Sequence, residues 1–530
     1  MSTHAIYRLF NLATPLVPLI FCLLLTSQTS AVTVHRLFGE LDTYTPPGQP
    51  VDSIVGLGNL STNATGAYAI RGRTFPAFNN TGFGMIYGRP DAVTADAILH
   101  EETDIPFGGQ TYFREGFGFN PQHNAGGQLA YGADVAFSGA FGSPQFDSLW
   151  IDNTPIIVEG DAISGLPGQS FESISLTRLT DSGVLYYEAS YGGNKRGLFS
   201  GTGVPLLKTG DIIGGTGDVV LDTDLGLGLG NTSVSTDGTN YITDTDVNPA
   251  IFPDPNPITD LVIINGNAAA FASDPAVYFK EDTVIPAADG GIGDLLEGLS
   301  NFDINNAGKW GGVGFTSDAT FDDIVVVDGT IIAREGDMLP TEAGGTTTLA
   351  GQAKNIDIND DGDVAFIFGD SIFVNGIEYL AVGAAVDNGE VLSRIQSNLD
   401  ITDRDANDII TVFFTGRDLV NSGAFADTAY SIELTLPANA IPGDLDGDGF
   451  VGIDDLNLVL SNWNQNVPPG NPLADPSGDG FVGIDDLNEV LGNWNAGTPP
   501  GTASNIPEPV SFGIFSVVLL TQVTSRGRNH

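Results

Sequence analysis

Short apolar runs separated by glycine-rich turns dominate this chain between residues 32 and 440. Runs such as Ile156–Val158 and Leu206–Leu207 lead directly into turns, whereas the 3.6-residue period of an amphipathic helix is scarce. Gly290–Leu299 is the stretch in which we expect a short helix. The chain of 530 residues contains 69 glycines and 30 prolines, which indicates many turns. The pattern therefore predicts a mainly β fold.

A degenerate turn motif, Asn-x-x-Gly-x-x-Ala-aromatic, recurs through the β region. Asn and Gly accept the positive φ of a tight hairpin, and the alternating Ala and aromatic residue begin a buried strand, so each copy predicts a hairpin. Six copies start 61, 56, 55, 70 and 54 residues apart. Clear copies begin at Asn63, Asn124 and Asn359, weaker ones at Thr180, Ser235 and Asn305, and a further degenerate unit begins near Asp405 and ends in Val412-Phe413-Phe414.

A second element, an apolar strand ending in a Gly-Asp turn, follows several of these hairpins. It is seen at Ile156–Asp161, Leu206–Asp211 and Ile331–Asp337, with a worn copy at His100–Asp104. A unit of about 55 residues has room for one four-stranded sheet. Such a sheet cannot bury both faces alone, but six or seven of them stacked around an axis can.

We therefore expect residues 32–440 to form a β-propeller-like repeat domain with six or seven blades. A β-sandwich array or a β-solenoid is the structural alternative. The repeats resemble bacterial families described by tandem NxxGxxAF-type motifs, which often accompany surface-anchoring tails. That resemblance says little about activity.

Two near-copies of an acidic 12-residue segment begin 31 residues apart, at Asp444 and Asp475. A calcium loop places oxygen ligands at alternating positions of such a segment, with glycine at position 6 for the sharp turn. Gly449 and Gly480 stand at that position. The second loop has one carboxylate fewer, so we expect it to bind more weakly. Two Ca²⁺ sites are thus expected, with the ligands Asp444, Asp446, Asp448, Phe450 (carbonyl) and Asp455, and Asp475, Ser477, Asp479, Phe481 (carbonyl) and Asp486.

An amphipathic helix is expected after each loop, with apolar residues from Ile453 to Trp463 and from Ile484 to Trp494. This loop-then-helix duplex, with Asp at position 12, resembles the type I dockerin module over residues 442–495. The resemblance implies a small α-helical EF-hand duplex at 441–497 that docks onto a cohesin-like protein, as in polysaccharide-degrading assemblies. The partner-facing pair in that family is often Ser-Thr. Here it is Ile-Asp in both copies, so cohesin specificity does not carry over.

Both ends of the chain have the character of targeting segments. Residues 1–31 have Arg8, an apolar run and small residues before Val32, which predicts a secretory signal peptide. An N-terminal anchor is the alternative, although the run is short for a membrane span. Cys22, the single cysteine, lies in this segment, so the mature chain would form no disulfide.

At the other end, residues 498–505 are expected to be a linker and 506–530 a sorting or anchor segment. Ile506-Pro-Glu-Pro509 precedes an apolar stretch, Val510–Val523, and then Arg526 and Arg528. This order resembles the PEP-CTERM signal, which implies processing by an exosortase-type enzyme at a bacterial cell surface. A frayed apolar tail is the alternative. Contact with a membrane would involve the terminal segments only.

The charge of the chain excludes one class of partner, and its motifs offer little catalytic chemistry. With 19 Lys and Arg against 66 Asp and Glu, the formal net charge is −47, which repels nucleic acid. The sequence has neither a His-Glu-x-x-His zinc motif nor a Gly-x-Ser-x-Gly nucleophile elbow. A glycosidase pair cannot be selected among so many acids. Catalytic residues therefore remain unassigned.

A few further residues are candidates for binding or for the core. Asp357–Gly362 has the start of a third calcium loop, but its last position is not a ligand, and Asp403–Asp408 calls for the same caution. Phe137, Phe315 and Phe366 are expected in the core. Trp150 and Trp310 fit either the core or a sugar-stacking platform.

The leading hypothesis is a non-enzymatic, exported surface protein. Its propeller would bind a glycan, such as an extracellular polysaccharide, or a protein, and its dockerin-like module would dock. The alternatives are a polysaccharide-degrading hydrolase or lyase tethered by the dockerin, and a structural matrix or envelope component. A deep central pocket with converging acids or a His would favour the enzyme, and a shallow aromatic-lined face would favour binding.

Overall fold

The computed structural model describes most of the chain as two compact units, which divide between Thr435 and Leu436. The expected signal peptide, linker and sorting segment lie outside the described residues. Among the residues described, no helix is long and apolar enough to cross a membrane. The structure describes residues 32–40, 42–44, 52–75, 84–89, 96–100, 104–107, 110–117, 121–136, 145–193, 195–225, 232–248, 259–287, 293–420, 424–437, 443–445, 450–467, 470–477 and 480–496.

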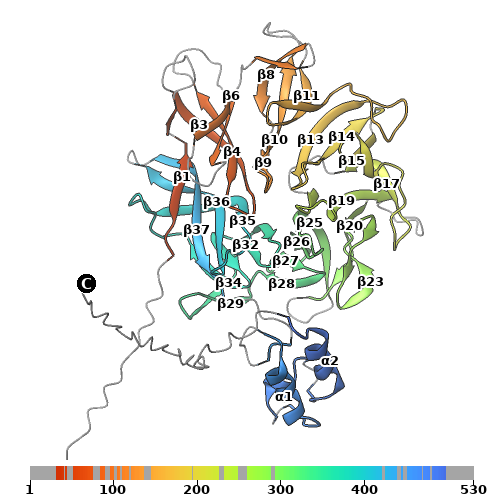
Figure 1. Ribbon diagram of the computed structural model, residues 1–530, viewed down its shortest axis with the longest axis vertical. Coiled ribbons are helices and arrows are strands. Elements are labelled where there is room, and N and C mark those ends of the chain that lie inside the picture. The colour runs from red at the N-terminus through yellow and green to blue at the C-terminus, as the bar shows by residue number, and fades with distance from the viewer. Residues whose placement is uncertain are drawn as a thin grey trace, which may run out of the picture. The chain divides into compact units, whose positions relative to one another are not determined.

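Seven antiparallel sheets, named here blades 1 to 7, stand in a ring in the first unit (Figure 1). Blade 1 has β2 (Thr43–Tyr44), β3 (Asp52–Thr62), β4 (Tyr68–Phe75), β5 (Gly84–Arg89) and β6 (Asp96–His100). Blade 2 has β7 (Asp104–Phe107), β8 (Gln110–Phe117), β9 (Gln122–His123), β10 (Leu129–Ala136), β11 (Phe146–Ile151) and β12 (Thr154–Val158). Blade 3 has β13 (Phe171–Leu179), β14 (Leu185–Tyr191), β15 (Lys195–Ser200) and β16 (Val204–Lys208).

The remaining blades follow in chain order, and two small hairpins lie between them. Blade 4 has β17 (Val219–Leu225), β18 (Thr232–Val234), β19 (Tyr241–Asn248), β20 (Thr259–Ile264) and β21 (Asn267–Ala268). Blade 5 has β24 (Val284–Ile285), β25 (Asp294–Ile304), β26 (Trp310–Thr316), β27 (Asp323–Val327) and β28 (Thr330–Arg334). Blade 6 has β31 (Ala353–Ile358), β32 (Val364–Phe368), β33 (Ser371–Val374) and β34 (Ile377–Ala381). The hairpins are β22 (Ala270–Phe271) with β23 (Asp274–Tyr278), and β29 (Met338–Pro340) with β30 (Thr346–Thr348).

Blade 7 joins the two ends of the propeller. Its order is β1-β37-β36-β35, formed by β1 (His35–Gly39), β37 (Ala424–Thr435), β36 (Ile409–Val420) and β35 (Leu392–Ile401). The N-terminal strand β1 pairs antiparallel with β37, with His35 opposite Ser431. Backbone hydrogen bonds therefore close the ring and leave fewer free strand edges. The predicted propeller is confirmed, and it has seven blades rather than six.

The helix expected at Gly290–Leu299 is wrong. This stretch enters β25, which pairs with β26, so that Leu299 lies opposite Gly314. Leu296, Leu299 and Phe302 are all buried, and two bulges keep them on the core side of the strand. Bulges shift the two-residue period of a strand, and a spacing of three residues can then mimic a helix.

The core lies between the facing sides of neighbouring blades. Leu149 of blade 2 and Phe199 of blade 3 belong to one buried cluster, and Val325 of blade 5 and Phe366 of blade 6 belong to another. Each sheet thus buries both faces against its neighbours, which a lone four-stranded sheet cannot do.

Of the aromatic candidates, Trp150 and Trp310 are core residues, with 0% and 6% of their surface exposed. Phe366 is buried as expected, and Phe137 lies outside the described residues. The prediction for Phe315 is wrong, because it is 47% exposed. It pairs with Gly298 on one side, where no side chain covers the ring, and with the acidic Asp323 on the other.

The Asn at the head of the repeated turn motif connects one blade to the next by a hydrogen bond, and is called here the latch Asn. The Oδ1 of Asn63 accepts hydrogen bonds from the backbone N–H groups of Thr65 and Ala67, both at 3.0 Å. Its Nδ2 donates to the backbone oxygen of Asn124 in the next blade, at 2.9 Å. The glycine of this turn, Gly66, has a φ of +79°. The same bond to the next blade runs from Asn124 to Thr180 (3.1 Å), from Asn305 to Asn359 (2.9 Å) and from Asn359 to Thr402 (3.0 Å).

This geometry corrects the expected role of the motif. The Gly takes the positive φ, but the four latch asparagines are not among the described residues with positive φ. The Asn is needed because one amide can both close its own turn and satisfy a carbonyl of the next blade. The Asp of each Gly-Asp turn, by contrast, forms its hydrogen bond within its own turn. The side chains of Asp161, Asp211 and Asp337 accept from the backbone N–H three residues earlier, at 2.8 to 3.0 Å.

Replacing one latch should destabilise the propeller. Asn359→Ala leaves the buried N–H of Asp363 and the carbonyl of Thr402 without these partners. A buried polar group without a partner costs about 1–3 kcal/mol, so we expect a loss in that range in chemical denaturation. Asn407→Ala, at an exposed turn, is the matched control and should change stability by less than about 0.5 kcal/mol. Equal effects of the two variants would contradict the latch role.

The second unit contains two copies of a short helix. Helices α1 (Ile453–Ser461) and α2 (Ile484–Gly492) each begin after a glycine, and a 3-10 turn, η1 (Pro472–Ala474), lies between them. Val459 and Val490 on the helices pack with Val451, Val482 and Ala474 in one small core. The helices begin at the two expected residues, Ile453 and Ile484. Their apolar stripes are only partly buried, because Trp463 and Trp494 remain 42% and 39% exposed.

Candidate functional site

A cavity of about 290 Å³ lies on the propeller axis, lined by residues from all seven blades. The first residue of the hairpin turn in each blade, such as Asn63 in blade 1, is called here the turn head. Each blade contributes to the cavity wall the side chain that lies two residues before its turn head. In blade 7 that head is Thr402, because Thr402 receives the latch from Asn359, and the hairpin is longer. The seven equivalent residues are Ser61, Gln122, Arg178, Ser233, Asp303, Asp357 and Asp400.

Amide and hydroxyl side chains form the rest of the polar lining. Asn301 and Asn355 are already oriented, since each donates to a backbone oxygen of the next blade at 2.8 Å. Phe302 is the one aromatic residue of the cavity wall and is almost fully buried. The cavity therefore offers hydrogen bonds rather than a stacking platform. Its further polar residues are Thr177, Thr232, Ser397 and Asn398.

The hairpin turns narrow the axis at one end of the cavity. Thr236 of blade 4 donates its hydroxyl to the Oδ2 of Asp360 in blade 6, at 3.0 Å, and Asn306 of blade 5 donates to the same oxygen at 2.6 Å. Blades 4 and 6 are not neighbours, so the Thr236 bond spans the turn of blade 5, whose Asn306 contacts both residues.

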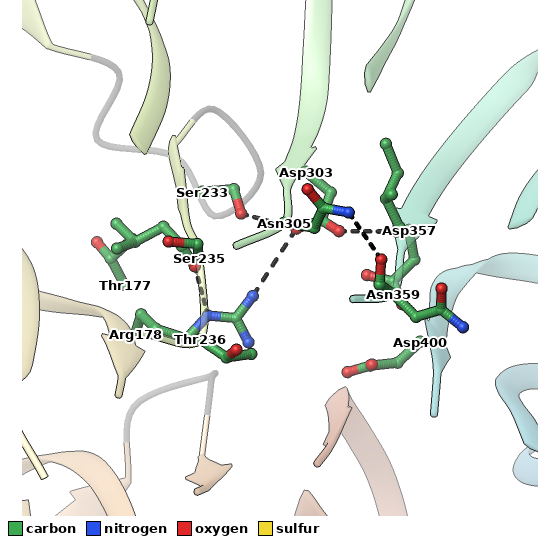
Figure 2. Close-up of polar contacts among 12 residues, drawn as sticks. Thr177, Arg178, Ser233, Ser235, Thr236, Asp303, Asn305, Asp357, Asn359 and Asp400 are labelled. Carbon is green, nitrogen blue, oxygen red and sulfur yellow. Dashed lines mark hydrogen bonds and ion pairs between the residues drawn. The ribbon is translucent and has the colours of Figure 1, made fainter. Parts of the chain in front are cut away.

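Three carboxylates lie side by side on blades 5, 6 and 7, as Figure 2 shows. Each accepts a hydrogen bond from a backbone N–H of the next blade: Asp303 from Ile358 at 2.7 Å, Asp357 from Ile401 at 2.6 Å, and Asp400 from Thr62 at 2.9 Å. The last bond bridges blade 7 and blade 1, where the ring closes. These three residues, the axial triad, thus hold the blades in register as well as line the cavity.

Arg178 is the single cation of the cavity lining and lies across from the axial triad (Figure 2). Its Nε donates to the backbone oxygen of Val234 at 2.8 Å, and its Nη2 lies 3.8 Å from the Oδ1 of Asp303. Ser233 donates to the same carboxylate oxygen at 2.8 Å. Asp303 is therefore compensated, whereas Asp357 and Asp400 have no such direct ion pair among the described residues.

Crowding of the triad favours its protonated form. Burial raises the pKa of Asp357, and the nearby carboxylates of Asp400 and Asp303 raise it further. Burial also raises the pKa of Asp400, to about 7, although the N–H of Thr62 and the charge of Arg178 act in the opposite direction. Like charges close together in a buried site disfavour the ionised form of one another. The triad therefore shares a proton near neutral pH.

This shared proton predicts that stability falls as pH rises. The folded triad keeps a proton that an unfolded carboxyl, with a pKa of about 3.9, has lost, so folded stability decreases from about pH 4 to about pH 7. The slope is at most about 1.4 kcal/mol per pH unit for one proton. Asp400→Asn, which still accepts from Thr62, should flatten it in urea denaturation at fixed calcium.

The comparison is made as the difference between wild type and variant. Burial raises the pKa of Glu188 to about 7 and that of Asp323 to about 6, so both contribute in the same pH window. The difference cancels their contributions. A difference that stays constant between about pH 4 and pH 8 would contradict the shared proton.

Sequence reasoning missed the axial triad and Arg178, although the positional signal was present, two residues before each turn head. It instead considered Asp357–Gly362 and Asp403–Asp408 as loop ligands. In the structure the side chains of these two segments have different contacts and do not gather around one site. Asp357 lines the cavity, Asn359 bonds Thr402, and Arg404 pairs with Asp363.

The candidate calcium ligands of the second unit fit the metal where they are described. Asp455 accepts from the N–H groups of Leu445 and Gly452, both at 2.7 Å, and is 1% exposed. Asp486 accepts from Ser477 and Gly483 at 3.1 and 2.6 Å and is fully buried. Each carboxylate oxygen keeps a lone pair for a cation.

The other candidate ligands divide between described and undescribed residues. Asp475 accepts from Gly480, whose φ is +85°, as the sharp turn of such a loop requires. Residues 441–500 contain ten acidic and no basic residues, so no side-chain cation of this segment can compensate the buried acids. Asp446, Asp448 and Asp479 lie outside the described residues, whereas Asp444, Phe450, Ser477 and Phe481 lie within them.

A further acidic group lies on blade 5. The ligand atoms of Asp322, Asp323 and Glu335 lie within 4.8 Å of one another. Asp323 accepts from the N–H of Ala353, and Glu335 from that of Gly351, so two of the three carboxylates hold blade 6 to blade 5.

Comparison with known proteins identifies no family for this chain. No protein-family model and no curated protein sequence matches the chain. It is similar to the Dos1 propeller, with 10% identity over 76% of this chain and 95% of that one, and a TM-score of 0.30. It is also similar to an endo-1,5-α-L-arabinanase from Thermotoga petrophila, with 12% identity over 68% and 97%, and a TM-score of 0.20. The sheets of this chain themselves define it as a seven-bladed β-propeller protein.

Proposed function

We propose that this chain is an exported bacterial cell-surface protein whose propeller binds a carbohydrate in the axial cavity. The observation that carries the proposal is the composition of the cavity wall. Amide, hydroxyl and carboxylate side chains from the seven blades line one small volume. A volume of about 300 Å³ is at the small end of ligand pockets. Oriented hydrogen-bonding groups suit a ligand with many hydroxyls, because each buried polar group needs a partner.

The C-terminal unit supports the second part of the proposal, a calcium-stabilised dockerin-like docking module. Two matched loops, each with a buried carboxylate at position 12 and a helix behind it, are what such a duplex requires. Bound calcium would neutralise the buried carboxylates and fix the loops against the helices. A cohesin-like protein is the expected partner, and the terminal segments would provide export, exosortase-type processing and attachment.

A hydrolase is the second candidate, since a central pocket with converging acids was the feature expected of an enzyme. The geometry limits it. Each acid of the axial triad accepts a hydrogen bond from the backbone of the next blade, and Asp303 is also bound by Ser233, so all three have a role in the fold. No His lines the cavity. These facts favour binding over hydrolysis.

Isothermal titration of the full chain with a panel of mono- and oligosaccharides tests the proposal. At least one sugar should bind to the wild type and lose affinity tenfold or more in Ser397→Trp, which fills the cavity from an exposed position of its wall. Thr346→Trp, on the exposed hairpin strand β30, is the matched control. Binding that survives Ser397→Trp would overturn the assignment to this cavity. Release of reducing ends, lost in Asp357→Asn, would establish the hydrolase instead.

A further inference from the structure

The axial cavity has a negative charge that its own residues do not balance. Three carboxyl groups face one guanidinium, and Arg178 lies closest to Asp303. Burial and the nearby carboxylates of Asp303 and Asp400 favour a protonated form of Asp357, so the triad shares a proton. Counting that proton, the cavity keeps a net charge of about −1 near neutral pH. No other charged side chain lines the wall to change this balance.

Enclosure makes this charge matter for a ligand. The triad lies on the inner strands β25, β31 and β35, surrounded by the other blades, where water screens charge poorly. An acidic ligand would be repelled. A neutral ligand would displace water and leave the charge without compensation, which is costly in such a site. A positively charged ligand would be attracted, and more strongly once the shared proton leaves.

The spacing of the carboxylate oxygens in the cavity favours an organic cation over a metal ion. A bare metal ion needs several oxygens close together, whereas an ammonium group on a ring can bridge wider sites. Within the described residues, the trio of acidic groups with ligand atoms all within 4.8 Å of one another is Asp322, Asp323 and Glu335, and the axial triad does not meet that limit. The amide and hydroxyl groups of the wall remain for the rest of a larger ligand.

Resting on the carbohydrate-binding function above, we propose that the axial cavity selects an amine-bearing sugar over neutral and acidic sugars. The ammonium group lies against Asp357 and Asp400, and the sugar hydroxyls contact the amide and hydroxyl side chains of the wall. The bound cation favours ionised carboxylates, so binding releases the proton that the triad shares. Affinity for the amine therefore increases with pH through the range in which the triad titrates.

Titration of the full chain with D-glucosamine, D-glucose and D-glucuronate at pH 7 tests this selection. Glucosamine should bind at least tenfold more tightly than glucose, and glucuronate should bind more weakly than either. Proton release should be visible as a heat that differs between two buffers of unequal ionisation enthalpy. Asp400→Asn should reduce the preference for the amine to about twofold and abolish the proton release while glucose still binds.

A second variant tests the role of the cavity charge through a gain in selectivity, which misfolding cannot produce. Arg178→Gln keeps a donor for Val234 and removes the positive charge of the cavity. It should widen the preference for glucosamine over glucose several-fold. Equal affinities of the wild type for glucosamine and glucose would overturn the amine selection and leave carbohydrate binding intact. If no sugar of the panel binds at all, the proposed function fails and this inference fails with it.

Discussion

Removing calcium is expected to unfold helices α1 and α2 and leave the propeller folded. Far-ultraviolet circular dichroism of the full chain should lose its helical component on addition of a chelator and regain it on addition of Ca²⁺. These two helices are the α-helices of the described residues, so the change reports on the second unit. The β signal of the propeller should stay constant, because its core lies between blades.

The reason is that this unit has little else to hold it together. Its core is built of Val451, Val459, Val482, Val490 and Ala474, which is few for an independent fold. Asp455 and Asp486 are buried in it, and residues 441–500 contain no basic side chain to pair with them. Buried carboxylates without a countercharge cost several kcal/mol. A bound metal at 100 times its dissociation constant stabilises by about 2.7 kcal/mol per site, enough to decide folding in so small a unit.

A pair of variants separates metal binding from general acidity. Asp448→Ala with Asp479→Ala removes a ligand at position 5 of each loop, and helicity should then no longer respond to Ca²⁺. Asp454→Ala with Asp485→Ala removes the exposed acid at position 11 of each loop, which is not a ligand position, and should leave the response unchanged. Equal helicity of the wild type with and without calcium would refute the two sites.

The propeller could be predicted from sequence because its signal is local and repeated. The turn motif marks Asn63, Asn124 and Asn359 clearly, and the spacing gives the size of a blade. The number of blades stayed open because the last hairpin is longer. The residue that corresponds to the latch Asn in this hairpin is Thr402, which accepts the bond from Asn359. The turn that resembles the motif in sequence begins three residues later, at Asp405.

The offset of two residues from each turn head marks positions on the inner strands but does not show which blades are neighbours, so the axial triad was missed. Nothing in the segments around Asp303, Asp357 and Asp400 differs from a solvent-facing strand, and the chain has 66 acidic residues. Only the ring brings these carboxylates together, through bonds between residues 55 and 44 positions apart and one bond that spans 338 positions. The motif that sequence analysis did find, the latch Asn, fixes where they meet.

The ion pair of Arg404 and Asp363 should matter more to stability than any exposed pair of the propeller. Arg404 donates from Nε and Nη2 to the two oxygens of Asp363, at 2.7 and 2.6 Å. Both side chains are buried, with 7% and 1% of their surface exposed. Burial alone would raise the pKa of Asp363, but the bonds from Arg404, Asn375 and Asn359 lower it. The carboxylate therefore stays charged in the core and depends on its partner.

Arg404→Met should accordingly cost about 3–5 kcal/mol in chemical denaturation, because it leaves that charge buried and unpaired. Adding Asp363→Asn should recover part of the loss, since it removes the buried charge and its one amide oxygen can still accept a hydrogen bond from either Asn375 or Asn359. Arg417→Met is the matched control. Its pair with Asp427 is 38% and 25% exposed, so the cost should be below about 1 kcal/mol. If Arg404→Met were no more damaging than Arg417→Met, or if the double variant were no more stable than Arg404→Met alone, burial of this pair would not be what stabilises the hairpin of blade 7 against blade 6.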